Sequence, residues 1–135
     1  MSVEQRTVLV ADDDAAIRHL VRLLLTKDGF AVEEAVNGRD ALDRLRRKRY
    51  DCMILDLMMG PGSGFDVLDT MKRERPGRRF VVVASATAAR TIDQLDSDNI
   101  VAKIRKPFDI EELLRVVRKC CEDHSSGVRS PEAWG

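Results

Sequence analysis

Two hydrophobic patterns alternate along the chain, and each predicts a different kind of element. Short runs of valine, isoleucine and leucine have the composition of strands that are buried on both faces. The runs of this kind cover residues 7–11, 30–35, 51–55, 80–84 and 100–104. Between them, apolar residues recur at intervals of three and four, the spacing of one helix face. The pattern therefore predicts five strands separated by helices.

The segments with helical spacing have identifiable ends. The first ends near Gly29, the second follows a turn at residues 37–38, and the third ends at residues 76–77. A weaker helix is expected over about 87–95, and Asp109 is expected to cap the last one. The apolar stripes of the four stronger helices are Ile17, Leu20, Val21 and Leu24; Ala41, Leu42 and Leu45; Phe65, Val67, Leu68 and Met71; and Ile110, Leu113, Leu114 and Val117.

This alternation predicts an α/β fold, a doubly wound five-stranded parallel sheet with helices on both faces. Five such units match the flavodoxin-like strand order 2-1-3-4-5. Residues 7–122 are expected to form this single domain, after a polar N-terminal segment over residues 1–6. From residue 123 to residue 135 serine, glycine and proline replace the helical pattern, and this stretch is expected to be a disordered tail.

The composition excludes several classes of function. The 135 residues include 23 basic and 23 acidic ones, so the net charge gives no general attraction to nucleic acid or to an anionic membrane. No apolar run approaches the roughly 20 residues that span a bilayer, and a cytoplasmic location is expected. The three cysteines lack the spacing of a zinc site or a disulfide framework. Neither direct nucleic-acid binding nor membrane attachment is therefore expected as the main activity.

Polar residues follow four of the five predicted strands. Asp12 and Asp13 come after the first strand, Asp56 after the third, Ser85 after the fourth and Lys106 after the fifth. In an open parallel sheet, ligands bind beyond the carboxyl ends of the strands, where the strand order reverses. The fold therefore gathers three carboxylates, one hydroxyl and one ammonium on a single rim.

Three carboxylates on one rim repel one another. At about 5 Å and an effective dielectric near 20, each pair costs roughly 3 kcal/mol. A hard divalent cation relieves this repulsion, and Mg²⁺ prefers oxygen ligands. A carboxylate beside Mg²⁺ can attack phosphorus, while Lys106 and Ser85 hold the remaining phosphoryl oxygens. Asp14, next to the acidic pair, is expected mainly to cap the first helix.

Four segments carry a resemblance to a known family. The segments VLVADDD, LDLMMGPGSG, VVVASA and IRKPF together resemble the receiver domains of two-component response regulators, over about residues 7–122. The resemblance implies that Asp56 is the phosphoacceptor and that Ser85 and Lys106 are the conserved hydroxyl and lysine. It also implies Mg²⁺ held directly by Asp13, Asp56 and the carbonyl of Met58, and through water by Asp12. It further implies a cis bond before Pro107.

The same resemblance implies partners. A sensor histidine kinase or a phosphotransfer protein would donate the phosphoryl group, so the chain is expected to be a signalling domain rather than an enzyme. It would catalyse only its own phosphorylation and slow dephosphorylation. The face formed by the predicted helix over 87–95, the strand over 100–104 and the last helix would then change partners. Either an unknown output protein or a second copy of the chain would bind that face.

Some positions depart from the family pattern. Lys103 stands where the family usually has an aromatic switch residue, and the usual glycine–alanine pair is absent around Asn99. These differences do not affect the residues that would accept the phosphoryl group. They predict an unusual way of transmitting phosphorylation to a partner. The resemblance also implies that Met58 and Thr87 occupy the positions that flank the approach of water to the acceptor. Neither side chain would position a nucleophile, so slow loss of the phosphoryl group is expected.

Two other functions remain open from the residues. Asp12 and Asp14 have the spacing of the nucleophile pair of haloacid-dehalogenase-type phosphatases. That family has threonine where this chain has Ala16, and the chain lacks room for a cap domain. The second alternative is a receiver that acts as a scaffold without phosphorylation, which the replacement at Lys103 favours.

Overall fold

The computed structural model describes residues 5–125, with side chains up to residue 122. The expected tail from residue 126 onward and residues 1–4 of the N-terminal segment lie outside this range. The final helix continues to Ser125, three residues further than the sequence pattern predicts. In chain order the elements are β1 (Thr7–Ala11), α1 (Ala15–Lys27), β2 (Ala31–Ala35), α2 (Gly38–Arg47), β3 (Cys52–Leu55), α3 (Gly64–Glu74), β4 (Val81–Ser85), α4 (Ala89–Asp93), β5 (Ile100–Arg105) and α5 (Ile110–Ser125).

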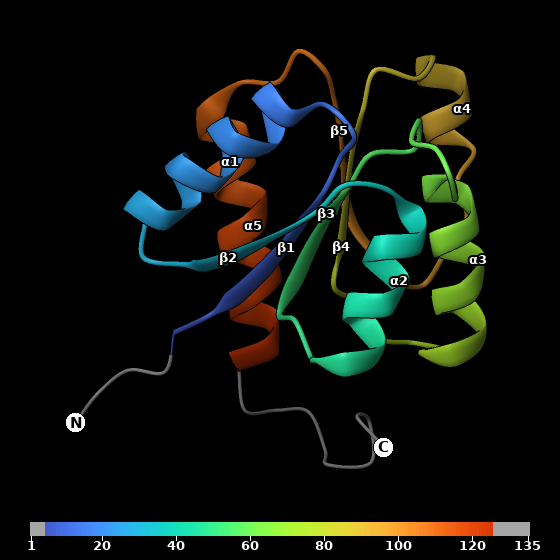
Figure 1. Cartoon of the computed structure of the whole chain (residues 1–135), viewed down its shortest axis with the longest axis horizontal. Helices are drawn as coiled ribbons and strands as arrows, with labels where there is room; N and C mark the ends of the chain where they lie inside the picture. The colour runs from blue at the N-terminus through green and yellow to red at the C-terminus, as the bar shows by residue number, and fades with distance from the viewer. Residues whose placement is uncertain (1–4, 126–135) are drawn as a thin grey trace.

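The five strands form one parallel sheet in the order β2-β1-β3-β4-β5. This arrangement confirms the predicted doubly wound fold. Figure 1 shows α1 and α5 on one face of the sheet and α2 and α3 on the other. The order reverses between β1 and β3, so the residues that follow these two strands meet at one edge.

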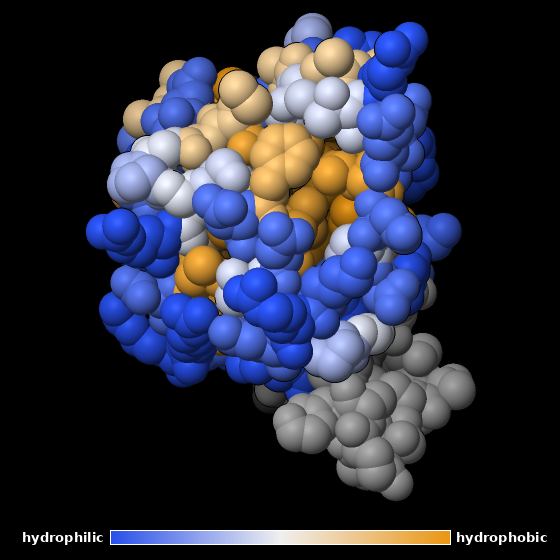
Figure 2. Space-filling view, turned by 90° about the vertical axis from the view of Figure 1, so that its right-hand side faces the viewer, coloured by the Kyte–Doolittle hydropathy of each residue, from blue (hydrophilic) through white to orange (hydrophobic). Residues whose placement is uncertain are grey.

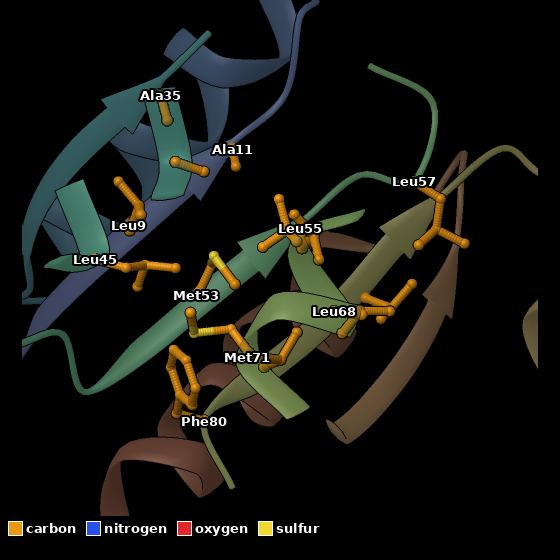
Figure 3. Packing of buried hydrophobic residues seen from close by; sticks show 14 of the residues in the cluster. Leu9, Ala11, Ala35, Leu45, Met53, Leu55, Leu57, Leu68, Met71 and Phe80 are labelled. Carbon is orange, nitrogen blue, oxygen red and sulfur yellow. The ribbon is translucent and has the colours of Figure 1, made fainter. Parts of the chain in front are cut away.

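Strand periodicity divides the core into two layers. Successive side chains of a strand point to opposite faces, so Leu9 packs toward α2 and α3 while Val8 and Val10 pack toward α1 and α5. Figure 3 shows the first layer, where Leu55 of β3 lies near Leu68 of α3. Burial on both faces explains why these strands read as continuous apolar runs.

Polar side chains cap the helices. The Asp14 carboxylate accepts hydrogen bonds from the amides of Ala16 and Ile17, which confirms its expected capping role. Ser63 and Asp66 form a reciprocal capping box at the start of α3. Ser63 therefore has a structural function at the start of α3.

The fourth helix is shorter than predicted. The pattern predicted a helix over about 87–95, but α4 covers only Ala89–Asp93. Its N-cap position, Ala88, has no side chain that can accept a hydrogen bond, and Ile92 is its one buried residue. A weakly anchored helix of five residues leaves a hollow of about 230 Å³ beside α3, lined in part by Phe65, Leu68 and Leu95. Figure 2 shows apolar surface among polar side chains on this side of the molecule.

Within residues 5–125, no helix combines the length and the apolar character that a membrane crossing requires.

Candidate functional site

Backbone hydrogen bonds place two acidic residues at the point where the strand order reverses. Asp12 follows β1, and its amide donates to the carbonyl of Ala35 at 3.2 Å. Asp56 follows β3, and its amide donates to the carbonyl of Ala11 at 3.0 Å. These bonds extend the sheet ladder by one residue on each strand. The two carboxylates are therefore fixed by the sheet itself.

Three carboxylates converge at this edge. Asp12, Asp13 and Asp56 each offer an oxygen, and these oxygens lie within 4.8 Å of one another. Asp12 and Asp56 are only 4% and 5% exposed, whereas Asp13 faces solvent. The repulsion anticipated from the sequence is therefore present at the expected separation and is strongest between the two buried groups.

Lys106 neutralises part of this charge. Its ammonium lies 2.5 Å from one oxygen of Asp12 and 3.4 Å from one oxygen of Asp56. Its amide donates to the carbonyl of Ser85 at 3.0 Å, which holds the end of β5 beside β4. The lysine therefore crosses the sheet edge and binds both buried carboxylates at once.

The other oxygen of Asp56 accepts hydrogen bonds from two neighbours. The hydroxyl of Ser85 donates to it at 2.9 Å, and the amide of Met58 donates at 3.2 Å. The hydroxyls of Ser85 and Thr87 lie 2.9 Å apart. Asp56 is thus held through both of its oxygens, so its orientation is fixed before any ligand arrives.

A glycine allows α3 to begin directly against the loop that follows Asp56. A Cβ at Gly64 would lie 2.2 Å from the carbonyl oxygen of Asp56 and 2.6 Å from the Cα of Leu57. Any side chain at this position would push the helix or the loop aside. Gly64 therefore sets how closely α3 approaches Asp56.

Burial changes the acidity of the site. It raises the pKa of Asp12, and the nearby charge of Asp56 acts in the same direction. The hydrogen bond from Lys106 and the amide of Asp14 oppose these effects but do not cancel them. An added cation would stabilise the ionised form, because it would restore the interactions that burial removes.

The structure brings together most of the residues predicted from the strand ends. Asp12, Asp13, Asp56, Ser85 and Lys106 meet there, with Thr87 beside Ser85. Met58, whose amide contacts Asp56, is 62% exposed. The Lys106–Pro107 bond is cis, the isomer that the resemblance implies, and the Gly60–Pro61 bond is cis as well.

Asp14 and Lys103 do not take part in this group of side chains. The Asp14 carboxylate serves the start of α1. Lys103 is exposed on β5, where its ammonium donates to the carbonyls of Leu95 at 3.0 Å and Asp93 at 3.5 Å. Lys103 therefore holds the end of α4 rather than the acidic site.

Arg18 is a supporting residue that sequence reasoning missed. Its guanidinium donates to the Asp12 carbonyl at 2.9 Å and pairs with Glu34 at 2.8 Å. It thereby connects the residue that follows β1 to α1 and β2. An arginine on a helical surface carries no sequence signal for such a role.

Comparison with known proteins agrees with the geometry. A profile of the response regulator receiver domain matches residues 8–118. The chain is 29% identical over 112 residues to sporulation initiation phosphotransferase F of Bacillus subtilis, covering 83% of this chain and 90% of that protein. It is 32% identical over 117 residues to the probable transcriptional regulatory protein TcrX of Mycobacterium tuberculosis, covering 83% of this chain and 48% of that protein. It matches the regulator NtrC of a Bradyrhizobium strain at 28% identity, where it spans 26% of that protein.

Solved structures share the fold. The response regulator protein TrrA from Thermotoga maritima, in complex with Mg²⁺ and BeF, superposes with a TM-score of 0.77 at 28% identity. That match covers 86% of this chain and 99% of the TrrA chain. The receiver domain of the Francisella response regulator 1452 gives a TM-score of 0.81 at 25% identity, covering 89% of this chain and 99% of its own.

Proposed function

Because this chain belongs to the response regulator receiver domain family, we propose that it is a phosphorylation switch with Asp56 as its acceptor. A sensor histidine kinase or a phosphotransfer protein would be the donor. The observation that carries the proposal is the environment of Asp56. This carboxylate is buried at the end of β3, held through both oxygens, and faces two further carboxylates and an ammonium.

The acidic residues fit Mg²⁺. The ion binds carboxylate and carbonyl oxygens at about 2.0–2.1 Å, so two oxygens on one ion lie about 3–4 Å apart. The three carboxylates offer oxygens within 4.8 Å of one another, so at most small side-chain movements would bring them to that spacing. Asp13 and Asp56 would bind the ion directly, Asp12 through water, and Met58 through its carbonyl. A bound Mg²⁺ would neutralise charge on the phosphoryl oxygens during the transfer.

The chain's own residues account for the rest of the transfer. An oxygen of Asp56 attacks phosphorus, a P–O bond forms, and the P–N bond to the donor histidine breaks. The electron pair of that bond stays on the leaving imidazole. Ser85 and Lys106 already contact the acceptor, so they are placed to bind phosphoryl oxygens once the group has arrived.

Two similar proteins support this proposal through their names alone. One is described as a phosphotransferase of sporulation initiation, and the other was solved with Mg²⁺ and BeF. Beryllofluoride mimics a phosphoryl group. Both are consistent with a chain that accepts phosphate at a metal-dependent carboxylate.

The position of Asp14 disfavours a haloacid-dehalogenase-type phosphatase. That chemistry would require Asp14 to act beside Asp12 on the substrate. Instead, the Asp14 carboxylate accepts two amide hydrogen bonds at the start of α1 and is exposed. Stoichiometric labelling is therefore expected, without steady turnover of a phosphomonoester.

We propose that the output surface is the face formed by α4, β5 and α5. Lys103 ties β5 to the end of α4, so a shift of α4 would move an exposed positive charge. Together with Arg105 and Arg115, Lys103 would attract an acidic output protein or arrange a symmetric dimer. If Lys103→Glu leaves phosphorylation-dependent binding and dimerisation unchanged, this surface is not the output surface.

The test of the proposed function is labelling by a small phosphodonor. The protein is incubated with acetyl phosphate, with Mg²⁺ or with EDTA, and its intact mass is measured. One phosphoryl group per chain is expected with Mg²⁺, and none with EDTA. Continuous release of phosphate without a labelled chain would favour the phosphatase. If beryllofluoride and Mg²⁺ leave α4 and β5 unchanged by amide exchange, the scaffold alternative holds.

A further inference from the structure

A hollow lined by basic side chains lies at the end of the sheet opposite the acidic site. It measures about 320 Å³, and its lining consists of Leu45, Arg46, Arg47, Lys48, Arg49, Arg75 and Arg78. Figure 1 shows the carboxyl ends of α2 and α3 side by side at this lower edge, where β3 and β4 begin. The proposed phosphorylation chemistry uses none of these residues.

The chain has no net charge, yet its basic residues are concentrated in two segments around this hollow. Residues 44–49 and 72–79 hold ten of the 23 basic residues but only one of the 23 acidic ones. Some of these charges are neutralised, since Arg46 pairs with Glu74 at 2.9 Å and Lys48 pairs with Glu33 at 2.5 Å. Six basic residues line the hollow, and none of the lining residues is acidic. The lining itself is therefore cationic.

Arg78 is the most buried charged residue that lines this hollow. It is 8% exposed, its guanidinium lies 4.2 Å from the centre of the Phe80 ring, and it donates to the carbonyl of Tyr50. Burial and then the charges of Arg49 and Arg75 lower the pKa of Arg78 to about 10. An anion bound in the hollow would favour the charged form of Arg78, because it would oppose the repulsion from these neighbouring cations.

The turn that carries two of these arginines is held rigidly. The side-chain amide of the buried Asn99 donates to the backbone carbonyls of Arg75 and Arg78, both at 2.8 Å. Between them Gly77 has a φ of +78°, a conformation that other residues rarely adopt. Asn99 stands where the family's usual glycine–alanine pair is missing, so this departure fixes the shape of the hollow. A preorganised arginine loses less conformational freedom when it binds a ligand.

From this geometry we propose that the hollow binds an oligophosphate group, meaning two or three linked phosphates of a nucleotide or of an inorganic polyphosphate. Guanidinium groups bind phosphate oxygens in pairs, and several of them converge here from α2 and from the turn before β4. The volume lies at the lower end of the range for small-ligand pockets, about 300–1,000 Å³. A nucleic-acid duplex would instead require an extended basic surface.

The test is a calorimetric titration of the full chain at physiological salt with EDTA present. Inorganic triphosphate and ATP are titrated separately, and both are expected to bind one site per chain. Equal affinities would mean that the phosphates alone are recognised, and tighter binding of ATP would mean that its nucleoside adds contacts. If neither ligand saturates a site, or if only duplex DNA or an anionic vesicle binds, the proposal fails.

Charge-matched variants separate a built site from general attraction. Arg75→Gln removes a lining guanidinium and should weaken triphosphate binding about tenfold or more. Arg73→Gln removes the same charge from an exposed neighbour outside the lining and should change the affinity less than twofold. Equal losses in the two variants would overturn the proposal. Arg47→Gln provides a second lining variant if Arg75→Gln folds poorly.

Labelling by acetyl phosphate keeps this proposal separate from the proposed function. Arg75→Gln should accept a phosphoryl group as the wild-type chain does, because its side chain lies at the other end of the sheet. Loss of labelling together with triphosphate binding would mean that the variant is misfolded or that the two sites are one, and would overturn the claim of a separate site.

Discussion

Replacing Lys106 with methionine tests the electrostatic account of the acidic site. Methionine keeps most of the side-chain length but removes the charge that binds Asp12 and Asp56 together. The two carboxylates then face each other without a counter-ion. We expect the free energy of unfolding at pH 7, without divalent metal, to fall by about 3 kcal/mol.

The magnitude follows from the distances. With carboxylate oxygens no more than 4.8 Å apart and an effective dielectric near 20, the repulsion between Asp12 and Asp56 is at least about 3.5 kcal/mol. Removing one member of a buried ion pair typically costs about 3–5 kcal/mol. The Lys106 side chain is 12% exposed, so solvent screens part of this cost and the lower end of the range applies.

Two conditions should reduce the loss. Mg²⁺ should stabilise the variant more than the wild type, because the ion replaces the missing positive charge. Low pH should also reduce the loss of stability. Burial raises the pKa of Asp12, so protonation of this carboxylate favours the folded state. The stabilisation that a raised carboxyl pKa provides is complete below the pKa of the unfolded chain. It is lost as the pH rises through the pKa of the folded protein.

Urea unfolding, followed by circular dichroism in EDTA and in Mg²⁺, measures these differences. The control is Lys103→Met, which removes an exposed lysine from β5, three residues before Lys106, and should cost less than about 1 kcal/mol. A loss below 1 kcal/mol for Lys106→Met, or an equal gain from Mg²⁺ in variant and wild type, would refute the reasoning.

Three further predictions follow from other parts of the structure. Tyr50, the single tyrosine, should titrate near pH 12 in an ultraviolet absorbance titration, because burial and then its 2.6 Å hydrogen bond to Glu33 raise its pKa. Its contribution to stability should be complete below pH 10 and lost toward pH 12, and a midpoint near 10 would contradict this burial. Asp13→Ala should weaken Mg²⁺ binding without lowering the free energy of unfolding, since Asp13 is exposed and repels its neighbours; unchanged affinity in a metal titration would exclude it as a ligand. Placing Asn at Met58 and Glu at Thr87 should shorten the lifetime of the acyl phosphate about tenfold, equivalent to about 1.4 kcal/mol of barrier, and an unchanged decay rate would show that these side chains do not control the attacking water.

The sequence was most informative where hydrophobic periodicity was strong. The apolar runs around Leu9, Leu55 and Val82 predicted buried strands, and the parallel sheet with its strand order is confirmed. The pattern was least informative around α4, where few apolar residues mark the helix and only Ile92 is buried. Propensity alone could not predict that the helix would have five residues, because tertiary contacts determine where a weak helix ends.

The acidic site could be anticipated because it depends on topology. Residues at the ends of neighbouring parallel strands lie close together, so they can be identified once the strand order is known. The strand order therefore predicted that Asp56 lies close to Asp12 and Ser85. Contacts made by long side chains could not be anticipated in this way. Arg18 reaches the Asp12 carbonyl and Lys103 reaches the end of α4 through flexible side chains whose direction no periodicity predicts.

The central claim is that Asp56 alone carries the phosphoryl group, and peptide mapping after labelling with acetyl phosphate and Mg²⁺ tests it most directly. Borohydride reduction of the acyl phosphate before digestion marks the labelled residue. We predict that the mark lies at Asp56, that Asp56→Asn abolishes it, and that Asp14→Asn keeps it at Asp56. A mark at Asp12 or Asp14, or full labelling of Asp56→Asn, would contradict the assignment of this site.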